Sequence, residues 1–308
     1  MGRYVLRRLL QLIPVFFGTT LLIYWLVWSV PGDPFAGKCG ERPCSPGFVQ
    51  VMTERYHLDE PLPIQYLYYM GNLLTGDFGQ TFGQREISDV IAQAYPNTIK
   101  LATMALLIEG VIGLTAGILT GLRRNGFLDN LVLVSTLFLL AIPTFVSGFV
   151  LQLVLGVQLG IVAPTVSDGA PWGDLIVPGF VLGAGSMAYV ARLTRASIAE
   201  NRRSDYVRTA IAKGLPMRRV VGVHLLRNSV IPVVTFLGTD LGTLMGGAIV
   251  TEGIFRINGI GGAVYQAVTT KETATVVGIV VVLVMVYLLM NLVVDLLYAV
   301  LDPRIRYD

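Results

Sequence analysis

Six long apolar runs alternate with polar segments along this chain of 308 residues. The runs cover about residues 9–30, 98–121, 129–159, 173–194, 229–252 and 275–301. Crossing the hydrocarbon of a bilayer takes roughly 20 apolar residues of helix. Because the runs are continuous and do not alternate with polar residues, they predict helices, which satisfy their own backbone hydrogen bonds in lipid. We therefore expect an all-α fold, a polytopic membrane protein with six transmembrane helices.

Composition supports this class, since 54% of the residues are hydrophobic and only 14% are charged. The first run follows Arg3, Arg7 and Arg8 and therefore resembles a signal peptide. It is too long for one, and residues 28–31 offer no small-residue cleavage site. We expect this run to stay in the protein as a membrane anchor.

The 23 lysines and arginines predict the orientation in the membrane. Most of them lie at the N-terminus, after the second run, between the fourth and fifth runs, and in the tail at Arg304 and Arg306. Basic residues accumulate in short loops on the cytoplasmic side of a membrane. With six spans, all of these segments face the cytoplasm, and so do both termini.

Three parts of the chain follow from this topology. Residues 1–30 hold the N-terminal segment and the first transmembrane helix. Residues 31–97 form an external region between the first two helices, with two expected surface helices near Leu62–Leu74 and Glu86–Ala94. Residues 98–308 form a five-helix core that includes a cytosolic loop at 200–227.

Two cysteines, Cys39 and Cys44, are the only ones in the chain and lie in the external region. An oxidising exterior allows a structural disulfide between them, and free thiols are the alternative. Four intervening residues do not fit a CxxC redox motif. Two thiolates without nearby histidines make a poor metal site, so no metal is expected.

The cytosolic loop is predicted to contain helices as well as basic residues. Residues 204–226 predict two short helices separated at Gly214, with Ser204 as the N-cap and Asp205 at the positive end of the helix dipole. Apolar side chains fall on one face of each helix at helical spacing. These are Tyr206, Val207, Ala210 and Ile211 in the first helix, and Met217, Val220, Val221, His224 and Leu225 in the second. Positive-inside bias explains the charge of the loop, but the caps and apolar faces predict docking against a partner.

Catalytic motifs are absent from the sequence. It contains no phosphate-binding GxxxxGK[ST] loop, no GxSxG and no HExxH, so no catalytic residue is expected. His57 is interpreted as an ordinary surface histidine and His224 as a packed interface residue. An integral-membrane enzyme is therefore disfavoured.

Acidic residues inside the apolar runs are candidates for a transport path. Glu109 lies midway in the second run and Asp240 midway in the fifth, with no basic residue at mid-span to pair with them. Such residues usually face a bundle interior or a wet cavity, although hydrogen bonding between helices is the alternative role. The fifth run also has a polar stripe and a glycine stripe, which predict a pore-lining helix or a tight subunit contact. The stripes consist of Thr235, Thr239 and Thr243, and of Gly238, Gly242 and Gly246.

A glycine-rich turn follows the fifth run, at residues 251–262, and a short apolar helix follows the turn. Irregular backbone at membrane depth is tolerated only where protein covers it or where it lines a cavity. We interpret this segment as a re-entrant external gate, with Phe255 and Tyr265 as candidate gate residues.

The cytosolic loop resembles the EAA loop with which permease subunits of ATP-binding-cassette importers hold their ATPases. Residues 208–210 occupy the EAA positions, and Gly214 follows at the family's spacing. The acidic residue and the terminal proline of the general pattern are missing. The loop is instead similar to the peptide branch, whose pattern YVRTAxAKG…HxLRN…xPV matches Tyr206–Gly214, His224–Asn228 and Pro232–Val233.

The resemblance extends over nearly the whole chain, to the B-type subunits of dipeptide and oligopeptide permeases. The matching segments are Arg7–Pro34, His57–Tyr66, Gly76–Gly79 and Leu301–Arg304. The family implies a type I importer permease fold in a bacterial inner membrane. It also implies a second homologous permease, two ATPase domains that bind ATP and magnesium, and an extracytoplasmic binding protein.

The resemblance assigns ATPase coupling to one set of residues in the loop. These are Ser204, Asp205, Tyr206, Val207, Arg208, Thr209, Ala210, Lys213, Gly214, His224 and Arg227. Peptide is the expected substrate, and nickel chelates, glutathione and haem-type compounds are the alternatives within the family. No cofactor is expected in this chain and no nucleic acid among its partners. A stand-alone channel or secondary carrier is the competing class, and the docking-type loop speaks against it.

Overall fold

The computed structural model describes residues 2–29, 35–39, 44–123, 125–246 and 248–301. These residues are almost entirely helical, and the only extended pairing among them is a single bridge between Gln80 and Glu86. The predicted all-α class is confirmed. The tail residues Arg304 and Arg306, and the motif ends at residues 31–34 and 302–304, lie outside the described residues.

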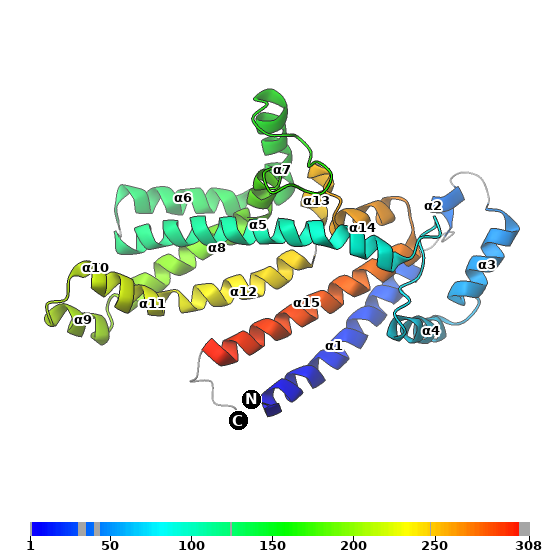
Figure 1. Cartoon of the computed structure of the whole chain (residues 1–308), viewed down its shortest axis with the longest axis horizontal. Coiled ribbons are helices and arrows are strands. Elements are labelled where there is room, and N and C mark those ends of the chain that lie inside the picture. The colour runs from blue at the N-terminus through cyan, green and yellow to red at the C-terminus, as the bar shows by residue number, and fades with distance from the viewer. Residues whose placement is uncertain (1, 30–34, 40–43, 124, 247, 302–308) are drawn as a thin grey trace. The chain divides into compact units, whose positions relative to one another are not determined.

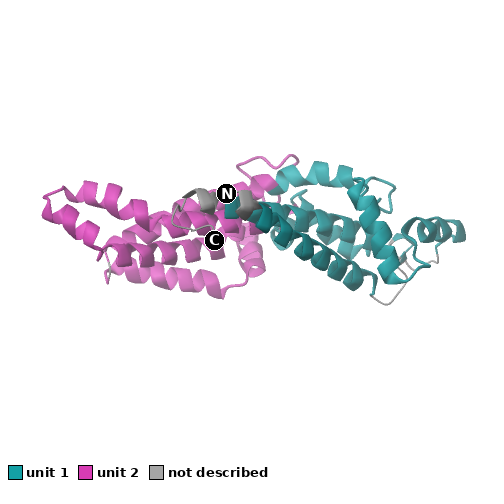
Figure 2. Cartoon of the chain, turned by 90° about the horizontal axis from the view of Figure 1, so that it is seen from below, with its two compact units in different colours: residues 1–98, 245–253, 257–308 teal, residues 99–244, 254–256 magenta. Residues whose placement is uncertain are grey.

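Two compact units make up the chain (Figure 2). The first comprises residues 1–98, 245–253 and 257–308, and the second comprises residues 99–244 and 254–256. The helices of the first unit, labelled in Figure 1, are α1 (Gly2–Trp28), α2 (Ala36–Cys39), α3 (Pro46–Tyr56), α4 (Leu62–Leu74), the start of α5 (Ile87–Leu122), α13 (Ile249–Phe255), α14 (Ile260–Thr269) and α15 (Thr273–Leu301). The helices α5 and α13 each contribute to both units, since residues 99–122 of α5 and residues 254–255 of α13 fall in the second.

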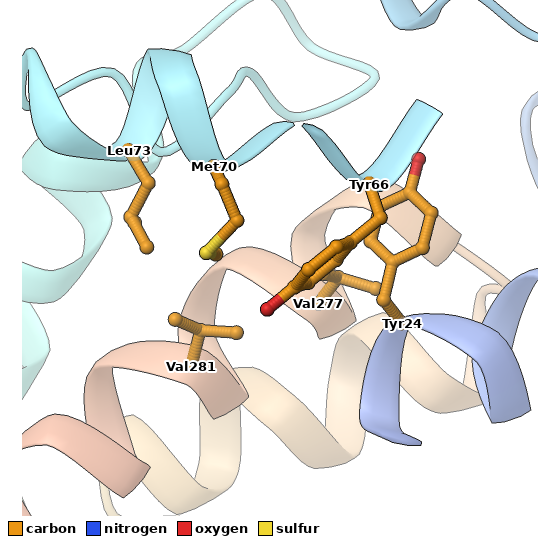
Figure 3. Close-up of a cluster of buried hydrophobic side chains, with 6 residues drawn as sticks. All are labelled: Tyr24, Tyr66, Met70, Leu73, Val277 and Val281. Atoms are coloured by element: carbon orange, nitrogen blue, oxygen red, sulfur yellow. The ribbon is translucent and has the colours of Figure 1, made fainter. Parts of the chain in front are cut away.

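The core of the first unit joins segments that are far apart in sequence. Figure 3 shows a buried cluster contributed by α1, α4 and α15, which consists of Tyr24, Tyr66, Met70, Leu73, Val277 and Val281. The hydroxyls of Thr20 and Tyr66 lie 2.8 Å apart and hydrogen bond beside this cluster. A second cluster packs the start of α5 against α14 and α15 through Ile87, Ala94, Ile260, Val264, Ile279 and Leu283. Helix α4 is therefore held on α1 and α15 by burial of apolar surface.

The second unit contains the rest of α5 and the loop at residues 200–227 that was predicted to be cytosolic. Its other helices are α6 (Phe127–Ala141), α7 (Thr144–Leu151), η1 (Gln152–Gln158), α8 (Ile176–Asn201), α9 (Asp205–Ala212), α10 (Met217–Arg219), η2 (Val220–Leu225), α11 (Leu226–Ser229) and α12 (Ile231–Met245). The elements η1 and η2 are π-helical.

Glycines on α5 allow this helix to pack closely against α8. A Cβ atom at Gly113 would lie 2.7 Å from the Val190 side chain, and one at Gly121 would lie 2.9 Å from Ile198. Gly117, midway between them, faces Thr194 in the same way. Small residues at four-residue steps let two helix backbones approach in a membrane. The glycine stripe of the fifth run was predicted from the sequence, whereas the stripe on α5 was not.

Within the described part of the chain, four helices are long and apolar enough to cross a membrane by themselves, and two bent helix pairs could raise the number to six. Two of the six predicted runs are therefore not single straight helices. Residues 127–158 bend by 100° between α6 and α7, because Ile142 adopts an extended conformation before Pro143. The second bend, of 44°, separates Met217–Ser229 from Ile231–Met245 at the start of the fifth run. That run also divides near its other end, where α12 ends at Met245 and α13 forms a separate helix.

The external region agrees with the sequence in part. The helix predicted at Leu62–Leu74 is confirmed as α4. The surface helix predicted at Glu86–Ala94 is wrong as a separate element, since α5 runs unbroken from Ile87 to Leu122. Helix α3 was not predicted. In its last turn the Tyr56 hydroxyl donates to the Gln80 carbonyl at 3.1 Å, and burial raises the pKa of Tyr56.

Cys39 and Cys44 are joined by a disulfide in the structure, with their Cα atoms 5.3 Å apart. The bridge connects α2 to the residue that precedes α3 by two positions. Phe35, Met52 and Phe82 form a small buried cluster in the same region, with Cys44 packed at its edge.

Candidate functional site

The first helix of the cytosolic loop has the expected ends. Ser204 occupies the N-cap position with an extended backbone, and its carbonyl accepts the amides of Val207 and Arg208 at 3.1 and 3.2 Å. Its hydroxyl makes no capping bond, so the expected side-chain cap is wrong. Gly214 ends the turn with φ of +72°, a left-handed conformation that glycine adopts without steric cost.

The inner face of the loop packs against the membrane helices of its own unit. A buried cluster joins Val207 and Ala210 of α9, and Val220 and Leu225 of η2, to Ile198 of α8. All five side chains are at most 5% exposed. Part of the predicted apolar face therefore has its partner within this chain.

The outer face of the loop is exposed and mixes apolar with basic side chains. Tyr206 is 38% exposed, Ile211 50% and Met217 62%. Tyr206 and Ile211 were predicted to share one apolar face with Val207 and Ala210, and Met217 was predicted to share another with Val220 and Leu225. In the structure each of these faces divides, because only the side that meets α8 is buried. Asp205, Arg208, Thr209, Lys213 and Arg227 are exposed as well, while His224 is partly buried.

Polar contacts tie this loop to the ends of the spans. Arg202 donates from Nη1 to the Leu122 carbonyl at 3.1 Å, which satisfies one free carbonyl at the C-terminal end of α5. The Tyr206 hydroxyl donates to Asn201 Oδ1 at 2.7 Å. Asp205 and Arg208 lie 4.0 Å apart in an exposed pair that contributes little.

A bidentate ion pair holds α6 against α8 (Phe127–Ala141 and Ile176–Asn201). Arg195 donates from Nε to Asp129 Oδ1 at 2.6 Å and from Nη2 to Oδ2 at 2.8 Å. Asp129 is 1% exposed and also accepts the Asn125 amide at 2.9 Å. This pair was not predicted, although the sequence places an aspartate and an arginine next to apolar runs.

Glu109 and Asp240, predicted to line a path, face each other. Their carboxyl groups interact electrostatically, and Glu109 is fully buried. On α12, Thr239 and Thr243 are exposed, Thr235 and Asp240 are partly buried, and Gly242 is buried. The threonine stripe thus remains on the surface of this chain, whereas the glycine stripe lies closer to its interior.

The glycine-rich turn predicted at residues 251–262 is shorter in the structure, because α13 is helical to Phe255 and α14 begins at Ile260. Arg256 lies between the two helices in a left-handed conformation with φ of 51°, and α14 is the short apolar helix that was predicted to follow the turn. In the first unit, the buried carboxylate of Glu252 accepts the Thr98 hydroxyl at 2.8 Å and the Gly262 amide at 2.7 Å. Thr98 Oγ1 in turn accepts the Ile260 amide at 2.8 Å. This buried network was not predicted, and its only signal in the sequence was an acidic residue before a glycine-rich turn.

The two candidate gate residues differ in burial. Tyr265 of the first unit is 54% exposed. Phe255 belongs to the second unit and is 2% exposed, and its carbonyl accepts the Val166 amide at 2.9 Å. Among the residues that the structure describes, no cluster of three or more His, Cys, Asp or Glu side chains could hold a metal ion.

Two family models match the chain. The first, described as binding-protein-dependent transport system inner membrane component, matches residues 113–307. The second, described as the N-terminal part of a binding-protein-dependent transport system membrane component, matches residues 1–102. Together they cover both units.

Curated relatives align over their full lengths. The chain is 37% identical to the di/tripeptide transport system permease protein DppB of Pseudomonas aeruginosa, with 99% of each chain covered. It is 36% identical to the glutathione transport system permease protein GsiC of Escherichia coli K12, with 100% of each covered. It is 35% identical to the dipeptide transport system permease protein DppB of Alkalihalophilus pseudofirmus, with 99% of each covered. The chain therefore belongs to the family of inner membrane components of binding-protein-dependent transport systems.

Proposed function

We propose that this chain is one permease subunit of an ATP-driven importer of dipeptides and oligopeptides in a bacterial inner membrane. Relatives named as dipeptide, di/tripeptide and glutathione permeases, at 35 to 37% identity over nearly the whole chain, support this substrate class. Glutathione, itself a small peptide, is the second candidate, and the 36% identity to its permease favours it over nickel chelates and haem-type compounds.

The coupling role rests on one observation, which is that the cytosolic loop has a buried face and an exposed face. Its inner face is close-packed on Ile198 of α8, while Tyr206, Ile211 and Met217 remain exposed on its outer face. Exposed apolar side chains among basic ones suit a groove on a partner protein. Because a close-packed cluster transmits displacement, an ATPase that moves α9 would move α8 with it.

The remaining roles follow from family membership. ATP and magnesium would bind to two partner ATPase domains, and an extracytoplasmic binding protein would deliver the peptide. A second permease would complete the path beside Glu109, Asp240 and the exposed threonines of α12. The external turn with Phe255 and Tyr265 would gate that path, and both termini would lie in the cytoplasm.

Co-purification and reconstitution test the proposal. The tagged chain is solubilised gently from its native membrane, and mass spectrometry identifies the proteins that accompany it. We expect a second permease and ATPase subunits in stoichiometric amounts. When this complex is placed in proteoliposomes with its binding protein, it should take up a labelled dipeptide only with ATP. A chain that purifies alone and still transports would overturn the proposal in favour of a channel or secondary carrier.

A further inference from the structure

Helix α4 packs on a membrane span well inside the end of that span, although it belongs to the region predicted to be external. The Tyr66 hydroxyl oxygen lies 2.8 Å from that of Thr20 and 3.1 Å from the Phe17 carbonyl oxygen. The span of α1 ends at Trp28, eight positions after Thr20. With a rise of about 1.5 Å per residue, α4 therefore meets α1 roughly 12 Å inside the end of the span.

The span of α15 gives the same depth independently. Met70 and Leu73 of α4 share a buried cluster with Val277 and Val281 (Figure 3). The span of α15 begins at Thr273, eight positions before Val281. All three helices belong to the first unit, so their packing fixes the level of α4 within it. Because the span of α1, with 23 residues, is only slightly longer than a hydrocarbon layer of about 30 Å, these contacts lie within that layer.

The side of α4 that faces away from this core is apolar. Leu67 is 68% exposed and Leu74 is 82% exposed, and Ile64 is exposed on the same face at helical spacing. None of the 13 residues of α4 is charged. The nearest charged residues are Glu60 before the helix and Asp77 after it. A contiguous exposed apolar face of this kind indicates contact with a membrane or with another protein.

An apolar groove between α1 and α4 indicates which of these two covers the face. The groove has a volume of about 340 Å³, and its lining includes Leu21, Leu22 and Trp25 of α1 and Leu62 and Pro63 of α4. The three side chains from α1 are exposed on the surface of a membrane span. Acyl chains that contact α1 at this level therefore also reach α4 through the groove.

We infer that α4 is a re-entrant helix that lies in the hydrocarbon of the membrane, with Ile64 and Leu67 in contact with lipid acyl chains. It lies in the leaflet at the Trp28 end of α1, which is the outer leaflet in the proposed topology. The helix satisfies its own backbone hydrogen bonds, as this depth requires. Its Gln65 side chain is buried against the protein and donates to the Glu60 carbonyl at 2.7 Å. The inference adds a lipid-contacting surface to the proposed function and does not depend on the transported substrate.

Spin labels on the exposed face of α4 test this position. Leu67→Cys and, separately, Ile64→Cys are labelled with a nitroxide in the complete transporter complex, reconstituted in phospholipid bilayers. Cys39 and Cys44 are bonded to each other, so the new cysteine is the free thiol of this chain, and the unsubstituted complex supplies the background. Power-saturation electron paramagnetic resonance compares collisions with oxygen, which concentrates in lipid, and with a water-soluble nickel chelate. We expect the ratio of oxygen to nickel collisions at both positions to exceed that of a label in water several-fold.

Val51→Cys is the matched control, because Val51 is 60% exposed on α3, one turn from the charged residues Glu54 and Arg55. Its label should collide mainly with the nickel chelate. The inference is overturned if the labels on α4 also collide mainly with the chelate, which would place α4 in the aqueous exterior. It is equally overturned if neither reagent reaches them, which would show that a protein partner covers this face. An oxygen preference at Val51 as strong as that at Leu67 would overturn it as well, since α4 would then not differ from its surroundings.

Discussion

The carboxylate of Glu252 accepts a hydrogen bond from the Gly262 amide at 2.7 Å, in the first turn of α14. A negative charge at this end of a helix is stabilised by free amides and by the helix dipole. Glycine at positions 259 and 261 makes the approach possible, because a Cβ atom at either would meet the glutamate side chain. The turn between α13 and α14 is thus built around one buried acidic residue.

Thr98→Val should loosen this turn. Valine has the shape of threonine but leaves the Ile260 amide and one Glu252 oxygen without a partner. An unsatisfied buried donor costs about 1–3 kcal/mol, so the amides of Ile260 and Gly262 should exchange roughly tenfold faster or more. Hydrogen–deuterium exchange with mass spectrometry measures this. Thr103→Val is the control, since that hydroxyl bonds only to its own helix, and equal exchange in both variants would contradict the network.

Substitutions on the two faces of α9 should have separate effects. Val207→Ala removes buried apolar surface and should lower the stability of the permease by about 1–3 kcal/mol. Ile211→Ala, on the exposed face, should change stability by less than about 0.5 kcal/mol but weaken ATPase binding. Thermal unfolding in detergent and ATPase pull-down separate the two effects. If both variants still bind the ATPase normally, the docking surface lies elsewhere.

Gly214→Val should uncouple ATP hydrolysis from uptake. A Cβ atom at this position has open space, so the cost comes only from the left-handed backbone, roughly 1–2 kcal/mol for an ordinary residue. Asparagine tolerates this conformation better, and Gly214→Asn should retain more coupling. The number of ATP molecules hydrolysed for each peptide taken up is the measurement. Equal coupling in both variants would exclude backbone strain as the cause.

Arg195→Ala should destabilise the second unit strongly. It leaves Asp129, whose side chain is 1% exposed, without its bidentate partner. Removal of one member of a buried ion pair costs about 3–5 kcal/mol. Arg195→Lys should recover only part of the loss, because lysine lacks the planar fork of the guanidinium group. A melting temperature unchanged in Arg195→Ala would show that water replaces the arginine.

Gly117→Val should disrupt the contact between α5 and α8. A side chain at this position would collide with Thr194 and with the Ala191 carbonyl. Overpacking of a close contact typically costs about 1–3 kcal/mol. Gly185→Ala on α8 is the control, since no atom lies within 4 Å of its added Cβ and alanine favours the helix. Size-exclusion chromatography after stepwise heating compares the two variants, and equal stability would refute the close contact.

Local features of the fold could be predicted from the sequence. Continuous apolar runs of spanning length predicted the membrane helices, and α4 was predicted with its bounds at Leu62 and Leu74. Gly214 was predicted to end a helix because few other residues adopt its backbone conformation at low cost. The bend at Pro143 was missed because hydropathy continues across it, although the proline itself was visible.

Pairings between distant residues depended on the tertiary structure. Glu252 and Thr98 are 154 positions apart, and Asp129 and Arg195 are 66 positions apart, so no local pattern brings them together. The sequence by itself determined which segments are apolar and helical, because hydropathy and helix propensity act over a few residues. Only helix packing decided that Val207 faces inward while Ile211 faces outward, and that Glu109 meets Asp240. That packing reflects the fit of whole helix surfaces, which depends on many side chains at once.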